Sequence, residues 1–317
     1  MIVGFSSAPV NSKYLYAEGL VKNVHNISPY LLDAPTAYIE NRSKPLCKVP
    51  EMTTGNRPAD GGNLIIEAAD YDDFLAREPK AEKFIKQFMG SEEFINRKPR
   101  YCLWLVNATP KELRAMPQVL ERVEACRQAR LGGAPDRQKL ADMPTVFRET
   151  KNPDNFIIVP QVSSEKRRYV PMGFQTGEVI ASNLLFIIPD GTLYQLGILE
   201  SNVHMAWMRA VAGRLKSDYR YSKNVVYNNF PWPTPTPAQQ AVIEKTSQGI
   251  LDARALYPDS SLADLYDELT MPKELRAAHR ANDKAVMQAY GFWGKLNSES
   301  ECVAELMKMY EKLTHKE

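Results

Sequence analysis

The chain has 317 residues, enough for about two domains, and its 44% hydrophobic and 25% charged content is ordinary for a globular protein. No run approaches ~18 apolar residues, so we expect neither a membrane span nor a membrane partner. The net charge of +2 neither requires nor excludes a nucleic-acid partner, so evidence for such a partner has to come from local clusters of cations. The four cysteines and four histidines lack metal-ligand spacing, which predicts no metal site and buried thiols in a reducing, cytoplasmic compartment.

The first 88 residues contain few regular elements in this interpretation. Residues 1–48 are expected to be irregular and extended because several prolines interrupt any helix. Within them, Met1–Phe5 is apolar but too short for a signal peptide, and it is interpreted as a strand. Residues 53–62 are rich in turn formers and predict a long loop. From Tyr71 to Phe88 the apolar spacing predicts a helix that is broken at Pro79.

A strand and a helix are expected next. The compact apolar run 101–106 is typical of a buried strand. A helix is predicted to begin after Thr109, which forms a capping box with Glu112, and to continue towards Leu131 with a break near Pro117.

Between residues 147 and 194 the apolar period changes and predicts a small twisted sheet. The expected strands are 156–160, 168–172, 179–181 and 184–188. A helix is then predicted over 197–215, with one apolar face.

The alternating prolines of residues 229–235 mark a boundary, because they forbid helix there. Capping boxes at Thr236 and Ser298 predict that the rest is helical. The expected fold class is therefore α/β (α+β): a mixed region with a small twisted sheet and helices, followed by a helical C-terminal region.

Catalytic motifs are absent from the sequence. There is no glycine-rich turn for S-adenosylmethionine and no Asn/Asp-Pro-Pro-aromatic loop for a flipped base, since Asn152-Pro153 is followed by Asp154. Hydrolase, phosphate-loop and zinc-protease motifs are also missing. Glu165-Lys166 lacks the intervening residue of a nuclease motif, although a nuclease core stays open as an alternative. No catalytic, cofactor-binding or metal-binding residue is therefore assigned.

Positive charge gathers in three places. Residues 163–169 carry a net charge of +2 and residues 213–223 carry +3. Arginine can read guanine in the major groove, whereas serine and lysine more often hold phosphates. The alternatives are a solvated hairpin turn for the first cluster and cations at the C-terminal end of a helix for the second.

The third cluster and two further segments could each have a binding role or a purely structural one. Residues 96–101 could bind a phosphate or could protect the following strand from aggregation. The glycines of the loop 55–62 permit close approach to a ligand, or the loop is a plain connection. Phe230 and Trp232 could form a partner surface or could pack a linker on its own domain.

Several segments together resemble the C-terminal half of MmeI-like type IIL restriction–modification enzymes, which combine nuclease, adenine-N6 methyltransferase and target recognition in one polypeptide. The resembling segments are 27–32, 43–47, 90–95, 168–174, 193–199, 205–211, 213–222 and 228–233. The resemblance implies a methyltransferase remnant and connector over 1–48, a target recognition domain over 49–235, and a helical C-terminal domain over 236–317. Met1–Phe5 would match a late strand of the catalytic sheet.

The resemblance also implies sequence-specific recognition of double-stranded DNA, with the catalytic domain in the same or a separate polypeptide. S-adenosylmethionine would be the cofactor of the full enzyme and not of this chain, which would be inactive alone. The expected base-reading or phosphate-contacting group is Ser163, Ser164, Lys166, Arg167 and Arg168. The expected DNA-backbone contacts are Lys216, Arg220 and Lys223, with Arg57 and Lys98 as further candidates. A protein-interaction module of a restriction–modification or phage-defence complex remains the alternative.

Overall fold

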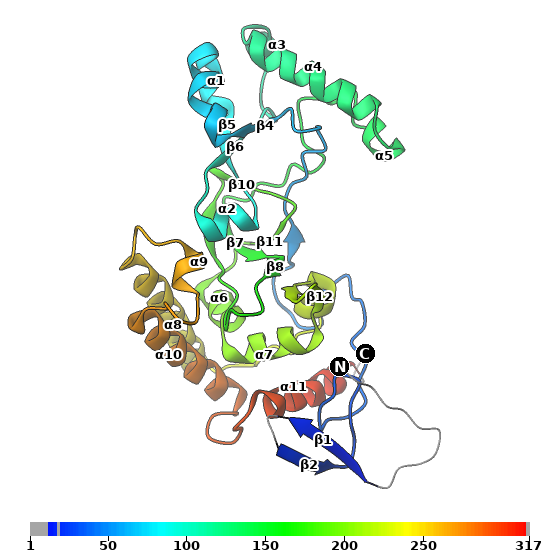
Figure 1. Ribbon diagram of the computed structural model, residues 1–317, viewed down its shortest axis with the longest axis vertical. Coiled ribbons are helices and arrows are strands. Elements are labelled where there is room, and N and C mark those ends of the chain that lie inside the picture. The colour runs from blue at the N-terminus through cyan, green and yellow to red at the C-terminus, as the bar shows by residue number, and fades with distance from the viewer. Residues whose placement is uncertain (1–11, 18–19, 315–317) are drawn as a thin grey trace.

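The computed structural model describes residues 12–17 and 20–314. Figure 1 shows an elongated molecule, with helices and a sheet at one end, sheets in the middle and packed helices at the other end. The predicted strand Met1–Phe5 lies outside the described residues. None of the helices in the described part is long and apolar enough to cross a membrane.

Residues 20–52 run along the lower part of the molecule, largely without regular structure, as predicted. The sequence predicts residues 1–48 to be irregular and extended, but it does not predict the antiparallel hairpin that β1 (Lys13–Ala17) and β2 (Leu20–Val24) form there.

The upper sheet has the strand order β10-β5-β6-β4 and its own apolar cluster. Its strands are β4 (Ile65–Glu67), β5 (Ile85–Met89), β6 (Arg100–Leu103) and β10 (Val179–Ala181). The surrounding helices are η1 (Ala68–Asp70), α1 (Tyr71–Arg77), η2 (Pro79–Phe84), α2 (Ser91–Asn96), α3 (Pro110–Arg114), α4 (Pro117–Leu131) and α5 (Pro135–Gln138).

Two predicted helix boundaries in this region are confirmed, and one predicted helix is too long. The Thr109 capping box starts α3, and the break at Pro117 separates α3 from α4. The helix predicted over 71–88 ends early, because Ile85–Met89 lies between β6 and β10 and hydrogen-bonds to both. Pairing on both sides outweighs the local helical spacing there.

The middle sheet is antiparallel, with the order β3-β11-β7-β9. Its strands are β3 (Thr53–Thr54), β7 (Asn155–Pro160), β9 (Gly173–Thr176) and β11 (Leu185–Pro189). Alternate residues of β7 enter two different apolar clusters, Ile157 and Val159 one and Phe156 and Ile158 the other, so both faces are buried. This explains why the strand has a continuous apolar run.

Two expected elements differ near this sheet. The strand predicted over 168–172 is absent, because Tyr169, Val170 and Met172 bury their side chains in the largest apolar cluster without pairing. The helix predicted over 197–215 is three elements: α6 (Leu193–Leu199), α7 (Asn202–Val211) and β12 (Gly213–Leu215). Ser201 separates the helices by accepting a hydrogen bond from the His204 backbone N–H (3.3 Å).

A third sheet has the order β12-β13-β8, with β13 (Asp218–Arg220) and β8 (Val162–Ser163). The π-helix η3 (Lys223–Tyr227) follows it. The remaining helices are α8 (Pro237–Ala255), α9 (Leu262–Leu265), α10 (Lys273–Tyr290) and α11 (Glu299–Thr314).

The predicted helical character of this last part is confirmed. The Thr236–Gln239 capping box begins α8, and the Glu301 backbone N–H donates to Ser298 Oγ (3.2 Å) at the start of α11. The largest apolar cluster joins these helices to α6 and α7 through side chains such as Trp207, which is fully buried. The α/β (α+β) class with small sheets followed by helices is therefore as predicted.

Candidate nucleic-acid interface

The third sheet brings together the two strongest basic clusters, which are about fifty residues apart in the sequence. We call residues 163–168 the basic loop and residues 213–220 the basic hairpin. Ser163 lies opposite Tyr219 in the sheet, and the Glu165 backbone N–H donates to Asp218 Oδ1 (3.3 Å). The basic loop therefore begins beside β13 and runs towards the turn of the hairpin.

The side chains of the basic loop range from buried to exposed. Ser163 is 4% exposed and its Oγ has no hydrogen-bond partner among the described residues. Lys166 and Arg168 are exposed. Arg167 is half-buried near the carboxylates of Asp218 and Asp267, and burial lowers its pKa despite these two acids.

The backbone between Arg168 and Tyr169 is firmly anchored. Arg209 on α7 donates from Nη1 to the Arg168 carbonyl (2.9 Å) and makes two further bonds to the carboxylate of Glu299 (2.7 and 2.8 Å). Tyr169 is 3% exposed, so the loop leaves the surface immediately after Arg168.

The basic hairpin projects cations from a tight turn. Leu215 pairs with Asp218, which leaves Lys216 and Ser217 as the turn, and Lys216 has a φ of 56°. Such a φ is uncommon for a residue with a side chain, and here it places a lysine at the tip. Arg214 lies over the Tyr219 ring (3.7 Å to the centroid) and bonds the Ser217 carbonyl (2.9 Å).

The alternative interpretation of this cluster is wrong. It treated Arg214 and Lys216 as cations at the end of a helix, but α7 ends at Val211 and both residues belong to the hairpin. Arg220 is also exposed, on the last residue of β13.

Lys223 and Arg57 line a cleft of about 430 Å³. Lys223 is the first residue of η3, three residues after Arg220. Arg57 is exposed, and its backbone N–H donates to Glu149 Oε2 (3.0 Å). Lys151 joins them in the lining, a cation for which the sequence offered no signal.

Lys98 stands apart from these groups. It follows α2 and forms an exposed ion pair with Glu92 (2.6 Å), and that pairing raises its pKa. It lines neither of the clefts that hold the other candidate cations.

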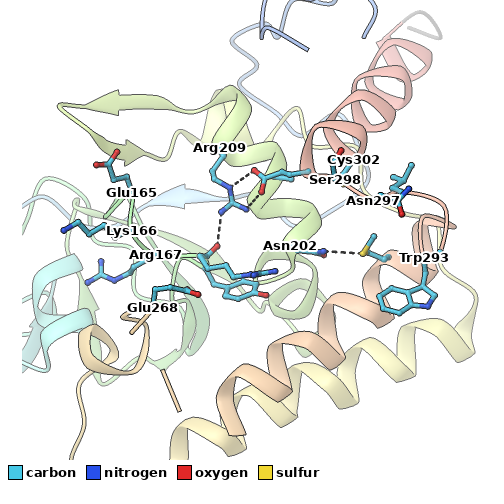
Figure 2. Close-up of a pocket in the computed structure, with 17 residues that line it drawn as sticks. Glu165, Lys166, Arg167, Asn202, Arg209, Glu268, Trp293, Asn297, Ser298 and Cys302 are labelled. Carbon is cyan, nitrogen blue, oxygen red and sulfur yellow. Dashed lines mark hydrogen bonds and ion pairs between the residues drawn. The ribbon is translucent and has the colours of Figure 1, made fainter. Parts of the chain in front are cut away.

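The basic loop also forms one wall of a larger cleft, of about 830 Å³. Figure 2 shows Lys166 and Arg167 on one side, Trp293, Asn297 and Ser298 on the other, and Arg209 between them. The second wall belongs to the turn between α10 and α11 and to the start of α11. Sequence reasoning missed Arg209, because a single cation on an apolar helix resembles ordinary surface charge.

The described residues include buried thiols but no cluster of metal ligands. In residues 12–17 and 20–314, no group of three or more His, Cys, Asp or Glu side chains is placed to hold a metal ion. Burial raises the pKa of Cys126 to about 11 and that of Cys302 to about 12, so these thiols stay protonated near neutral pH.

Comparison with known proteins assigns the family. The family model "MmeI, target recognition domain" matches residues 33–234, and the model "MmeI, C-terminal domain" matches residues 235–316. DNA methyltransferase A of Bacillus subtilis (strain 168) is 40% identical over 319 residues, which is all of this chain and 36% of that protein.

A solved structure agrees with this assignment. The type IIL restriction–modification enzyme MmeI, solved in complex with DNA, superposes with a TM-score of 0.91 at 40% identity. The match covers 97% of this chain and 42% of the MmeI chain, so this chain spans less than half the length of both relatives. The predicted resemblance is confirmed, and the chain belongs to the MmeI target recognition domain family, with the MmeI C-terminal domain following it.

Proposed function

We propose that this chain recognises a specific double-stranded DNA sequence on behalf of a restriction–modification methyltransferase. The observation that carries the proposal is the meeting of the basic loop and the basic hairpin in one small sheet. Lys166, Lys216 and Arg220 form no ion pair within the described part of the chain, so their charge is available to a partner.

The geometry suits a duplex. The major groove of B-DNA admits a two-stranded β-ribbon, and the basic hairpin presents two antiparallel strands at the β12 edge of the third sheet, with a lysine at its tip. Arg168 is exposed on a backbone that is fixed by Arg209, which favours base reading because a fixed backbone limits where the guanidinium can reach. Lys216, Arg220 and Lys223 would then hold phosphates, with Arg57 beside Lys223.

The relatives support the same function. MmeI is solved with DNA, and the Bacillus subtilis relative is a DNA methyltransferase. Catalysis, here proposed to be adenine-N6 methylation, would belong to a domain outside these residues, because the sequence lacks a glycine-rich cofactor turn and an Asn/Asp-Pro-Pro-aromatic loop. That domain would bind S-adenosylmethionine, while residues 49–235 would read the target and 236–317 would support them.

Selection from a pool of random duplexes at moderate salt tests the proposal. The wild-type chain should enrich one motif, and Arg167→Ala/Arg168→Ala should abolish that enrichment. Lys273→Ala is the matched control, because the Lys273 side chain is 92% exposed and lies at the start of α10. A folded wild-type chain that enriches no motif, or that instead binds a polypeptide in a salt-insensitive way, would overturn the proposal.

A further inference from the structure

The basic loop is held by residues of the helical region that follows it in the sequence. Tyr169 comes directly after the loop, and its hydroxyl donates to Asp283 Oδ2 on α10 (2.6 Å). The Tyr169 ring stacks on His279, also on α10, with 4.0 Å between centroids and 17° between planes. Both contacts fix the position at which the loop re-enters the protein.

Asp283 joins this anchor to α7. Its second oxygen, Oδ1, accepts from the backbone N–H of Asn202, the first residue of α7 (2.7 Å). A carboxylate at a helix N-terminus satisfies an otherwise unpaired N–H and is stabilised by the helix dipole. One buried carboxylate therefore sets both the end of the basic loop and the start of the helix that carries Arg209.

Arg209 completes a second connection. Its guanidinium bridges the Arg168 carbonyl and Glu299, the first residue of α11. Two helices of the region matched by the MmeI C-terminal domain thus reach the same loop, α10 through Tyr169 and α11 through Arg209. Among the described residues, no backbone hydrogen bond joins Arg168 to the strands of the third sheet.

We propose that the C-terminal helical region sets the sequence specificity of the basic loop, with Tyr169, Asp283, Arg209 and Glu299 as positioning residues that touch no base. This inference rests on the proposed DNA recognition. It means that a basic loop transplanted without its matching α10 and α11 contacts would bind DNA with reduced discrimination. A guanidinium held by a fixed backbone discriminates between bases, whereas a displaced one still attracts phosphates.

The test compares affinity for the selected target duplex with affinity for an unrelated duplex across a salt series. Tyr169→Phe removes only the hydroxyl and keeps the stacking on His279. The ratio of the two affinities should fall by about tenfold or more, because the hydroxyl gives up its charge-assisted hydrogen bond to Asp283 and its bond to the Arg168 side chain. Affinity for the unrelated duplex and the salt slope should stay unchanged, whereas a loss of folded protein would lower both affinities equally.

Tyr290→Phe is the matched control, because it removes a tyrosine hydroxyl that donates to the Pro231 carbonyl (2.9 Å), away from the basic loop. It should leave the ratio unchanged. Asp283→Asn should lower the ratio at least as much, because it weakens both the bond from Tyr169 and the bond from Asn202. Combining it with Tyr169→Phe should add little to the effect of Asp283→Asn alone, since the two variants share the Tyr169 bond.

The outcomes separate the two proposals. A wild-type chain without sequence preference would overturn both. A wild-type chain with a preference that survives Tyr169→Phe and Glu299→Gln undiminished would overturn only the positioning role.

Discussion

The buried cations of this protein and the cations of its basic loop and basic hairpin have opposite surroundings. Arg130 on α4 is fully buried, and its guanidinium donates to five backbone carbonyls, those of Pro58, Ala59, Leu140, Met143 and Val146. Arg254 on α8 is similarly enclosed by Glu200, Tyr266 and the Met172 carbonyl. Lys166, Lys216 and Arg220, in contrast, face solvent without an ion pair among the described residues.

The comparison shows what burial does to the role of a charge. A buried guanidinium whose donors are all satisfied holds segments together, and removing a partner leaves a charge that water cannot reach. An exposed cation contributes little to stability but remains available for phosphates. Buried arginines therefore stabilise the fold, whereas the exposed cations are the ones that we propose for a partner, and variants of each kind should separate stability from DNA binding.

The largest expected effect is on stability, in the buried region. Glu200→Ala should lower the free energy of unfolding by about 3–5 kcal/mol, because Arg254 stays buried without its carboxylate. Urea denaturation measures this. Glu92→Ala is the control, since its ion pair with Lys98 is 63% exposed on both sides and should be almost neutral. Equal losses in the two variants would contradict the comparison.

Lowering the pH should have an intermediate effect on the free energy of unfolding. His204 is fully buried, with Nε2 bonded to the Tyr221 hydroxyl (2.9 Å), and burial lowers its pKa to about 3. Since the unfolded chain takes up this proton near pH 6.5, stability is complete above that pH and is lost as the pH falls towards 3.

This loss can be isolated with His204→Gln, which keeps a polar side chain but does not titrate. Between pH 7 and pH 5 the wild-type chain should lose about 2 kcal/mol more than the variant in the free energy of unfolding. Denaturant titrations at several pH values measure the difference. Parallel pH profiles of the two chains would show that His204 is not responsible for acid sensitivity.

The smallest expected effect on stability belongs to the exposed region, where DNA binding should change instead. Lys216→Ala and Arg220→Ala should each reduce the slope of log affinity against log salt by about 1, because each removes one of the proposed phosphate contacts. Their unfolding midpoints should match the wild type. Lys273→Ala should alter neither quantity. A lower unfolding midpoint for Lys216→Ala would show instead that this lysine stabilises the fold.

Local rules predicted several elements of this fold correctly. The capping residues Thr109, Thr236 and Ser298 identified helix starts, since a side chain that satisfies an orphan N–H acts within one turn. The apolar run at 156–160 identified a strand that is buried on both faces. The predictions failed where long-range pairing competes, as at Ile85–Met89, which has helical spacing but is held between two strands.

For the candidate site, too, some features follow from the sequence and others only from the tertiary structure. The sequence by itself determined where cations cluster and which family the chain resembles, because composition and motif order are local properties. Only the tertiary structure decided that the basic loop and the basic hairpin share a sheet, that Lys98 is paired elsewhere, and that Arg209 and Asp283 anchor the loop. These facts depend on residues tens of positions apart meeting through pairing and burial, which no local pattern encodes.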